Sequence, residues 1–511
     1  TGDLPFKGNT TAVVFNEILS KAPTSPGRLN PELPDELENI IDKALEKDRE
    51  VRYQLAKDVL TDLRRLKREM DTEQAIITTR ISDKQSSIAV LPFVNTSPDP
   101  ENVYFSDGLA EELINAFTKI EGLSVASRTS AFQFKGKTQD IRQIGEQLNV
   151  NNVLEGSVRK AGNRLRVTAQ LISVSNGYQL WSEKYDRELK DVFEIQDEIA
   201  ENIVRALRVV LSEKEKSALE KPPTTNVEAY DYYLRGRKFF HEARRKSNEF
   251  ARQMFTRATQ IDPSYALAYS GIADCHSFLY MYWESTEENI REAERASRKA
   301  LELDPDLSEA HVSQGLAVSL SKRYDEAERQ FETAIGLNPR LFEAHYFYAR
   351  TCFAQGKLEK AARLYEKACE VRPEDYQAPL LLGSVYRGLG LEKKAEVVQR
   401  RGLEIVQKHL ELHPDDARAL YLGGVAHIQS GDRERGLQWA SQALEMDPEE
   451  PAILYNVACV YSNSGEVEEA IDCLEKALKV GFAHKEWIEN DSDLDPLRTH
   501  SRFQALLTRM K

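Results

Sequence analysis

A regular spacing of prolines in the second half of the chain constrains its fold more than any other feature. Six prolines each follow an apolar and a polar residue, at intervals of 42, 34, 34, 41 and 34 residues. They are Pro263, Pro305, Pro339, Pro373, Pro414 and Pro448. Ten residues after each proline stands alanine or glycine, whose small side chain lets two helices approach closely. The period predicts stacked helix pairs, because one pair alone cannot bury its apolar face.

In its details the repeat resembles the tetratricopeptide repeat. Small residues recur twelve and five positions before three of the prolines, as at Ala293 and Ala300 before Pro305. The 41-residue interval predicts a second helix that is longer by about two turns, and the 42-residue interval predicts an insert between helices around Tyr282. The resemblance implies seven helix pairs over residues 228–482, followed by a helical tail over 483–511.

In tetratricopeptide arrays the first helix of each pair lines a concave groove. The resemblance places groove positions four, seven, eleven and fourteen residues after each proline, which here are rich in aromatic and basic side chains. They include Tyr346, Arg350, Phe353, Arg387, Arg418, Tyr421 and Tyr455. We predict that a protein or peptide partner binds there, although each aromatic residue could instead serve helix packing. Among the positions that clamp a terminal carboxylate in some family members, only Arg350 fits, so no such clamp is expected.

Charge and composition argue against several other functions. A net charge of −14 and a pI near 5.4 oppose binding to nucleic acid, and no apolar run is long enough to span a bilayer. The five cysteines form no CxxC pair, which indicates free thiols in a reducing compartment. All nine histidines lie at or after His241, so no histidine-based site is expected before it. We expect a soluble, cytoplasmic protein without a metal site and without a membrane or nucleic-acid partner.

Residues 1–70 combine helical patterns with kinase-like sequence. Leu37, Ile40 and Ile41 recur on one helical face. The segments TGDLPFKG and KALEKDREVRYQ resemble the last part of the catalytic domain of bacterial serine/threonine protein kinases. The resemblance implies a remnant of the kinase C-lobe, in which Arg52 corresponds to a buried arginine that pairs with a glutamate absent from this chain. The alternative is a small helical domain unrelated to kinases.

The motifs that transfer phosphate are missing from the sequence. It contains no glycine-rich loop with its phosphate-binding lysine, and neither an HRD nor a DFG aspartate. We therefore expect no catalytic residue, no activity and no cofactor in this chain. ATP and magnesium are implied only for a parent kinase.

The segment 87–211, between linkers at 71–86 and 212–227, has the pattern of a small α/β domain. SIAVLPFV and LSVASR predict strands, and NVLEGSVRK and RLRVTAQLIS predict a hairpin. Helices are expected over about 106–118, 140–149 and 191–207. IAVLPF, YFSDGLAEEL and LEGSVRKAGNRLRVTAQL resemble the TolB amino-terminal-like domains that precede tetratricopeptide arrays in bacterial signalling kinases, adenylyl cyclases and winged-helix regulators.

Three acidic residues of this domain could suggest acid/base chemistry. Asp107, Glu111 and Glu112 fall near the start of a predicted helix, where acidic side chains favour the helix dipole. We interpret them as helix-start residues, and Gly108 and Gly156 as turn or close-packing residues.

Together these features predict a multidomain, mainly α-helical chain: a kinase C-lobe remnant, an α/β domain and an α-solenoid. The expected function is an interaction and regulatory region that recruits a partner or substrate to a cytoplasmic serine/threonine protein kinase. Two alternatives stay open. One is the kinase activity of the parent, and the other is the tail of an adenylyl cyclase or a winged-helix transcriptional regulator.

Overall fold

The chain forms two compact units, residues 1–85 and 86–511, each of which is described by itself. The computed structural model describes residues 10–21, 35–55, 57–60, 62–63, 86–120, 122–137, 139–212, 215 and 222–510. The first predicted linker therefore lies outside the described residues except for Ser86, and so does much of the second.

In the first unit the described helices are α1 (Thr11–Ser20) and α3 (Asp35–Ala44). The Thr10 side chain caps α1 by accepting a hydrogen bond from the Val13 amide. Lys47 Nζ donates to the Ile18 carbonyl at 2.7 Å and so joins α1 to the loop after α3. The Arg52 side chain is exposed. The described residues thus do not give Arg52 the enclosed position that the kinase resemblance implies.

The second unit begins with a mixed sheet. In the described part of residues 86–212, six strands form it: β1 (Ser86–Val90), β2 (Val94–Asn95), β3 (Leu123–Val125), β4 (Asn152–Ala161), β5 (Arg164–Ser173) and β6 (Gln179–Glu188). The order is β3–β1–β4–β5–β6, with β2 beside β4; β1 runs parallel to β3 and β4, and the last three strands are antiparallel. The predicted alternation along β5 is confirmed, since Leu165, Val167, Ala169 and Leu171 are buried.

Helices cover both faces of this sheet. α5 (Val103–Thr118) and α8 (Val192–Ala206) share the larger core with Ile88 and Val90 of β1. α6 (Arg128–Phe132) and α7 (Ile141–Gln147) form a smaller core with Ala89, whose side chain faces the opposite side of the strand. The sheet is therefore enclosed where its strands are parallel.

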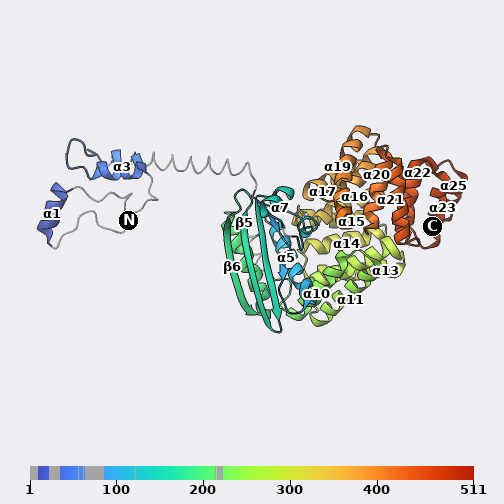
Figure 1. Cartoon of the computed structure of the whole chain (residues 1–511), viewed down its shortest axis with the longest axis horizontal. Helices are drawn as coiled ribbons and strands as arrows, with labels where there is room; N and C mark the ends of the chain where they lie inside the picture. Colours follow the sequence, from blue (N-terminus) through green and yellow to red (C-terminus); the bar gives the residue numbers. More distant parts are fainter. Residues whose placement is uncertain are drawn as a thin grey trace. The chain divides into compact units, whose positions relative to one another are not determined.

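Seven helix pairs follow within residues 222–510, a stretch described without a gap (Figure 1). The first helices are α10 (Val227–His241), α12 (Ala266–Phe278), α14 (Ser308–Leu320), α16 (Phe342–Ala354), α18 (Gln377–Gly388), α20 (Ala417–Gln429) and α22 (Pro451–Ser464). The second helices are α11 (Arg245–Ile261), α13 (Glu287–Leu303), α15 (Tyr324–Leu337), α17 (Leu358–Val371), α19 (Glu392–Leu412), α21 (Arg433–Met446) and α23 (Val467–Lys479). The predicted class, a mainly α-helical multidomain chain with a solenoid, is confirmed.

Two features of the array account for its unequal intervals. α19 has 21 residues and is the lengthened second helix. A π-helical turn, η3 (Leu279–Trp283), extends α12 and supplies the insert. The repeated small residues permit close helix packing: a Cβ atom at Gly315 would lie 2.9 Å from the Phe331 ring.

The array and the α/β domain share one core. Tyr230 and Leu234 of α10 pack in the same buried cluster as Phe105 and Leu109 of α5. A Cβ atom at Gly108 would lie 2.6 Å from the Leu234 side chain, so Gly108 is a close-packing residue, as predicted. The α/β domain is therefore held against the first repeat.

After the last pair, the chain forms three short helical segments. They are α24 (Lys485–Asn490), the 3-10 segment η4 (Ser492–Leu497) and α25 (Ser501–Arg509). No helix among the described residues combines the length and apolarity needed to cross a bilayer.

Candidate functional site

Four of the predicted groove residues come together on two first helices. Arg418 of α20 donates to the hydroxyl of Tyr421 at 3.0 Å and to that of Tyr346 on α16 at 2.8 Å. Arg350, one turn after Tyr346, donates to the same hydroxyl at 3.2 Å. The ring of Tyr282, from the η3 insert, lies 5.3 Å from the Arg418 guanidinium. We call these five residues the arginine–tyrosine cluster.

The positive charges of Arg350 and Arg418 in this cluster are not balanced by carboxylates among the described residues. Arg350 is only 6% exposed, and its Nε and Nη2 atoms have no hydrogen-bond partner in the described part of the chain. Within the same residues, neither arginine forms an ion pair with a carboxylate. Burial alone would raise the pKa of Tyr282, but Arg350 and Arg418 outweigh it and hold that pKa below its usual value. An anion would therefore be stabilised here.

Glu450 contributes only a weak opposite charge to this cluster. The carboxyl group of Glu450, which interacts electrostatically with Arg418, has a pKa raised to about 7, mainly by burial. It is only partly ionised at neutral pH, so it offsets little of the charge of the two arginines.

The other three predicted groove residues lie apart from the cluster. Phe353 is half-buried and packs against the helical core. Arg387 donates to Glu392 at 3.0 Å and to Gln399 at 2.6 Å. Tyr455 donates to Asp491 at 2.6 Å and stacks on Phe482 with ring centroids 4.5 Å apart.

The groove face of the array is covered by the chain's own residues 482–494, which we call the docked segment. His484 shares a hydrogen bond with the Met281 carbonyl of η3, and Glu486 forms an ion pair with Lys322 after α14. The indole ring of Trp487 lies 4.3 Å from the Arg350 guanidinium of α16. The first half of the segment thus contacts the second, third and fourth repeats.

The second half of the docked segment continues across the remaining repeats. Asn490 donates to the α16 carbonyl of Ala354 at 3.2 Å, and Ser492 to the α18 carbonyl of Ser384 at 3.3 Å. Asp493 accepts from Gln429 of α20 at 2.8 Å, and Asp491 accepts from Tyr455 of α22. One short segment therefore crosses first helices through to the seventh repeat, where the sequence predicted a groove open to a partner.

Asp491 and Asp493 also form a buried cluster with Cys459. Their ligand atoms lie within 4.8 Å of one another, the one such group of three or more among the described residues. Burial and the neighbouring Asp491 raise the pKa of Asp493 to about 8. Carboxylates and thiolates can bind divalent metals. Here, however, Tyr455 and Gln429 already donate to the two carboxyl groups, and the raised pKa of Asp493 lowers the negative charge that would attract a cation.

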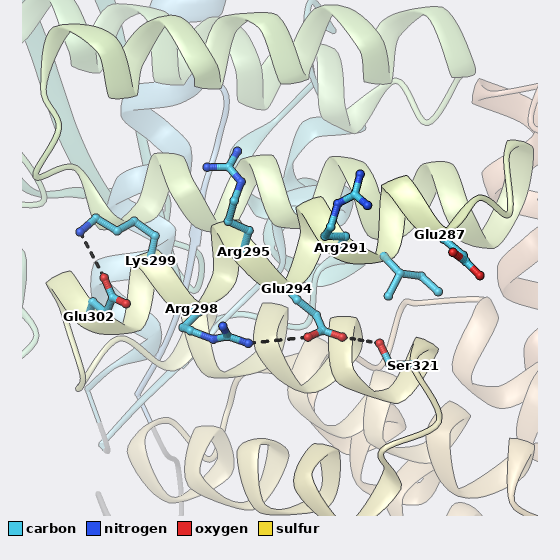
Figure 2. A pocket seen from close by; sticks show the side chains of 9 residues that line it. Glu287, Arg291, Glu294, Arg295, Arg298, Lys299, Glu302 and Ser321 are labelled. Atoms are coloured by element: carbon cyan, nitrogen blue, oxygen red, sulfur yellow. Dashed lines mark hydrogen bonds and ion pairs between the residues drawn. The ribbon is translucent and has the colours of Figure 1, made fainter.

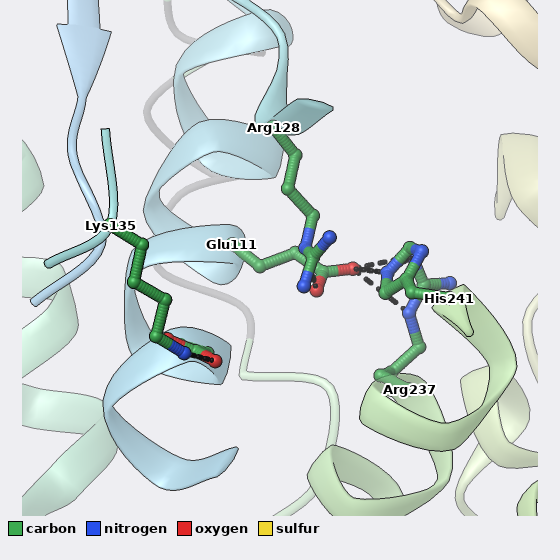
Figure 3. Close-up of polar contacts among 6 residues, drawn as sticks. Glu111, Arg128, Lys135, Arg237 and His241 are labelled. Atoms are coloured by element: carbon green, nitrogen blue, oxygen red, sulfur yellow. Dashed lines mark hydrogen bonds and ion pairs between the residues drawn. The ribbon is translucent and has the colours of Figure 1, made fainter. Parts of the chain in front are cut away.

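A second buried polar cluster joins α5 to α10 (Figure 3). Glu111 accepts hydrogen bonds from Arg128 at 2.9 Å, from Arg237 at 2.9 Å and from His241 at 3.0 Å. Burial alone would raise the pKa of Glu111, but the charges of Arg237, His241 and Arg128 hold it well below the usual value. We call these four residues the junction cluster.

The junction cluster corrects the interpretation of Glu111 as a helix-start residue. α5 begins at Val103, three residues before the predicted start. Glu111 therefore lies in the interior of the helix, and not in the N-terminal turn where the helix dipole favours acidic side chains. The carboxylate instead serves a buried ion-pair network, because the fold brings cations to it from α6 and α10. His241 of α10, the first histidine in the sequence, contacts the α/β domain through Glu111.

The surface of α13 offers a different kind of site. An open hollow of about 710 Å³ is lined by basic and acidic side chains of this helix (Figure 2). Arg291 pairs with Glu288, Arg298 lies 3.7 Å from Glu294, and Lys299 lies 3.2 Å from Glu302. Each of these cations is exposed and offset by a glutamate, so the hollow has little preference for an anion.

Comparison with known proteins supports the repeat assignment. Residues 321–376, 353–408, 400–451 and 451–480 match models of the tetratricopeptide repeat. Residues 84–202 match a family described as "HilA/YgeH-like transcriptional regulator, second domain". The array is therefore a tetratricopeptide array, a fold that serves protein–protein interaction.

Two curated relatives match parts of the chain. One is "Putative adenylate cyclase 3" of Rhizobium meliloti, 41% identical over 241 residues, which are 47% of this chain and 41% of that protein. The other is a "Probable serine/threonine-protein kinase" of Clostridium perfringens, 35% identical over 69 residues, which are 14% of this chain and 10% of that protein. The chain thus spans less than half the length of either relative.

Several solved tetratricopeptide structures are similar at low identity. YrrB, "a TPR protein with an unusual peptide-binding site", is 21% identical with a TM-score of 0.25, covering 38% of this chain and 96% of that one. The pilus biogenesis factor PilW is 17% identical with a TM-score of 0.34, covering 44% and 95%. The Cut9–Hcn1 complex gives 17% identity and a TM-score of 0.40, covering 63% of each chain.

Proposed function

We propose that this chain is the partner-binding and regulatory region of a signalling protein, and that its array recruits a protein through the groove face. The main support for this proposal is the arginine–tyrosine cluster. Four of its five residues lie at predicted groove positions of two repeats, and the Nε and Nη2 atoms of buried Arg350, with three N–H bonds, have no partner in the described residues. A buried donor without an acceptor costs free energy, so it marks a place where a ligand would bind favourably.

We propose a bacterial serine/threonine protein kinase, with ATP and magnesium as its cofactors, as the parent enzyme. The kinase-like segments of residues 1–70 and the 35% identity to a kinase support this choice. Phe15 and Leu19 of α1 are 61% and 75% exposed. Adjacent exposed apolar side chains are typical of a helix that packs against another part of a protein.

An adenylate cyclase is the second candidate for the parent. The cyclase relative is 41% identical over 241 residues, a longer and closer match than that to the kinase. The coding sequence upstream of the Thr1 codon would distinguish the two. HRD and DFG motifs there would support the kinase, and a cyclase catalytic domain would support the second candidate.

Recruitment itself is tested by capture of proteins from a lysate of the host on the immobilised chain, followed by binding measurements with the purified partner. Arg418→Gln should weaken binding, because it alters the groove cluster. Arg291→Gln, on the surface of α13, is the matched control and should bind as the unmodified chain does. Loss of binding in the control alone would place the partner on the α13 surface instead.

A further inference from the structure

The docked segment contacts the arginine–tyrosine cluster at Arg350 without neutralising its charge. The group that the segment presents to Arg350 is the indole ring of Trp487, at 4.3 Å. An indole face attracts a guanidinium, but it offers no acceptor to Arg350 Nε and Nη2. The indole ring therefore packs against the guanidinium and leaves Arg350 Nε and Nη2 without a hydrogen-bond acceptor.

Three of the four acidic side chains of the docked segment are engaged elsewhere. Glu486 pairs with Lys322. Asp491 and Asp493 accept hydrogen bonds from Tyr455 and Gln429, at the other end of the groove face. A segment rich in carboxylates thus lies along the groove and brings none of them to the arginines.

We propose that residues 482–494 act as an intramolecular place-holder, and that the partner segment which displaces them presents an acidic side chain to Arg350 and Arg418. This inference rests on the proposed function and names the chemistry of its partner. The partner is a protein segment that carries glutamate or aspartate where the docked segment carries Trp487.

Energetics explain why such a partner could replace a segment of the same chain. The docked segment is covalently attached and so has a high effective concentration, which a partner in solution must overcome. Arginine binds a carboxylate through two parallel hydrogen bonds, which are charge-assisted and stronger than contact with an aromatic face. The uncompensated arginines therefore give the advantage to a partner that supplies a carboxylate.

The experiment compares two substitutions at the covering residue in the whole chain. Trp487→Glu places a carboxylate beside Arg350, and Trp487→Gln is its neutral match. Hydrogen exchange of residues 484–494 reports how firmly each variant docks the segment. We expect exchange about tenfold slower with glutamate than with glutamine, the factor that one charge-assisted hydrogen bond supplies. Adding Arg350→Gln should abolish the difference.

Other results would contradict the inference. If exchange in Trp487→Glu were equal to or faster than in Trp487→Gln, the cluster would not favour a carboxylate. Unchanged exchange of α5 and α10 in every variant verifies that the fold is intact. A captured partner that binds the Arg350→Gln chain normally would also overturn the acidic-partner inference while leaving recruitment standing. If the unmodified chain binds no protein, the proposed function itself fails.

Discussion

The junction cluster and the arginine–tyrosine cluster use buried charge in opposite ways. At the junction, one carboxylate, Glu111, accepts from Arg128, Arg237 and His241, so that both arginines are paired with a carboxylate. In the groove, Arg350 and Arg418 face phenols and an indole ring, and within the described residues no carboxylate pairs with them. The arginines of the junction cluster have a carboxylate partner within the chain. Arg350 would gain such a partner only from a bound ligand. We infer that the junction is structural and the groove functional.

The largest effect should come from removing the carboxylate of the complete cluster. Glu111→Ala leaves two arginines without the charge that offset their desolvation, and it should lower the free energy of unfolding by about 3 kcal/mol. Chemical denaturation measures the loss, and hydrogen exchange should locate it at α5 and α10. Glu288→Ala, which removes an exposed partner of Arg291, is the control. Equal losses in both variants would mean that the junction cluster is not a special contact.

The pH dependence of the two regions should differ in sign. The pKa of Asp493 is raised to about 8, so the docked segment holds a proton that a released segment loses. Docking is fully stabilised below the ordinary aspartate pKa and weakens as pH rises toward 8, by at most about 1.4 kcal/mol per pH unit. Exchange of residues 484–494, corrected for intrinsic rates, should increase between pH 6 and 8.5. Asp493→Asn should remove that increase.

At the junction the change should occur in acid. Burial and the charge of Arg128 lower the pKa of His241 to about 4, although Glu111 opposes them. The unfolded chain binds this proton more readily, so the junction loses stability as pH falls from about 6.5 to 4. His241→Gln should flatten that part of the profile. Parallel pH profiles for α10 and for the docked segment would contradict the contrast between the two regions.

A smaller effect is expected from the buried arginine of the groove. Arg350→Gln removes a buried charge that has no carboxylate partner among the described residues. Because no ion pair is lost, the free energy of unfolding should change by about 1 kcal/mol or less. Arg237→Gln, in the complete cluster, should cost several times more. The melting temperatures of the two variants test this difference. Similar decreases in both would contradict the distinction between the two clusters.

The smallest effect should come from the exposed ion pairs of α13. Arg291→Gln disrupts a contact in which both side chains are more than 60% exposed, so stability should change by less than about 0.5 kcal/mol. The same variant should leave partner binding unchanged. A marked loss of stability or of partner binding would show that the α13 surface contributes to folding or to recognition.

Much of the array could be predicted because its signals are local and periodic. Pro339 and Pro373 mark repeat boundaries, and the longer interval before Pro414 predicted the lengthened α19. Alternation along one strand likewise predicted the buried face of β5. Such patterns arise from helix and strand geometry within short stretches of chain, which is why sequence alone reveals them.

The candidate site was predicted only in part. Arg350 and Arg418 stand at repeat-specific offsets, but they contact Trp487 and Tyr282, which follow no repeat pattern. Residues 482–494 lack the periodicity of an array helix, so the sequence predicted only a helical tail from residue 483 onward. The partners of Glu111 lie on elements distant in sequence, so the helix-dipole interpretation was the simplest one and was wrong.

Under this proposal, a partner binds on the groove face in place of the docked segment. Hydrogen exchange of the chain with and without its captured partner tests this directly. We expect slower exchange in α16 and α20 and faster exchange in residues 484–494, since the partner displaces the segment as it binds. Slower exchange confined to α13 and α15, with residues 484–494 unchanged, would contradict it.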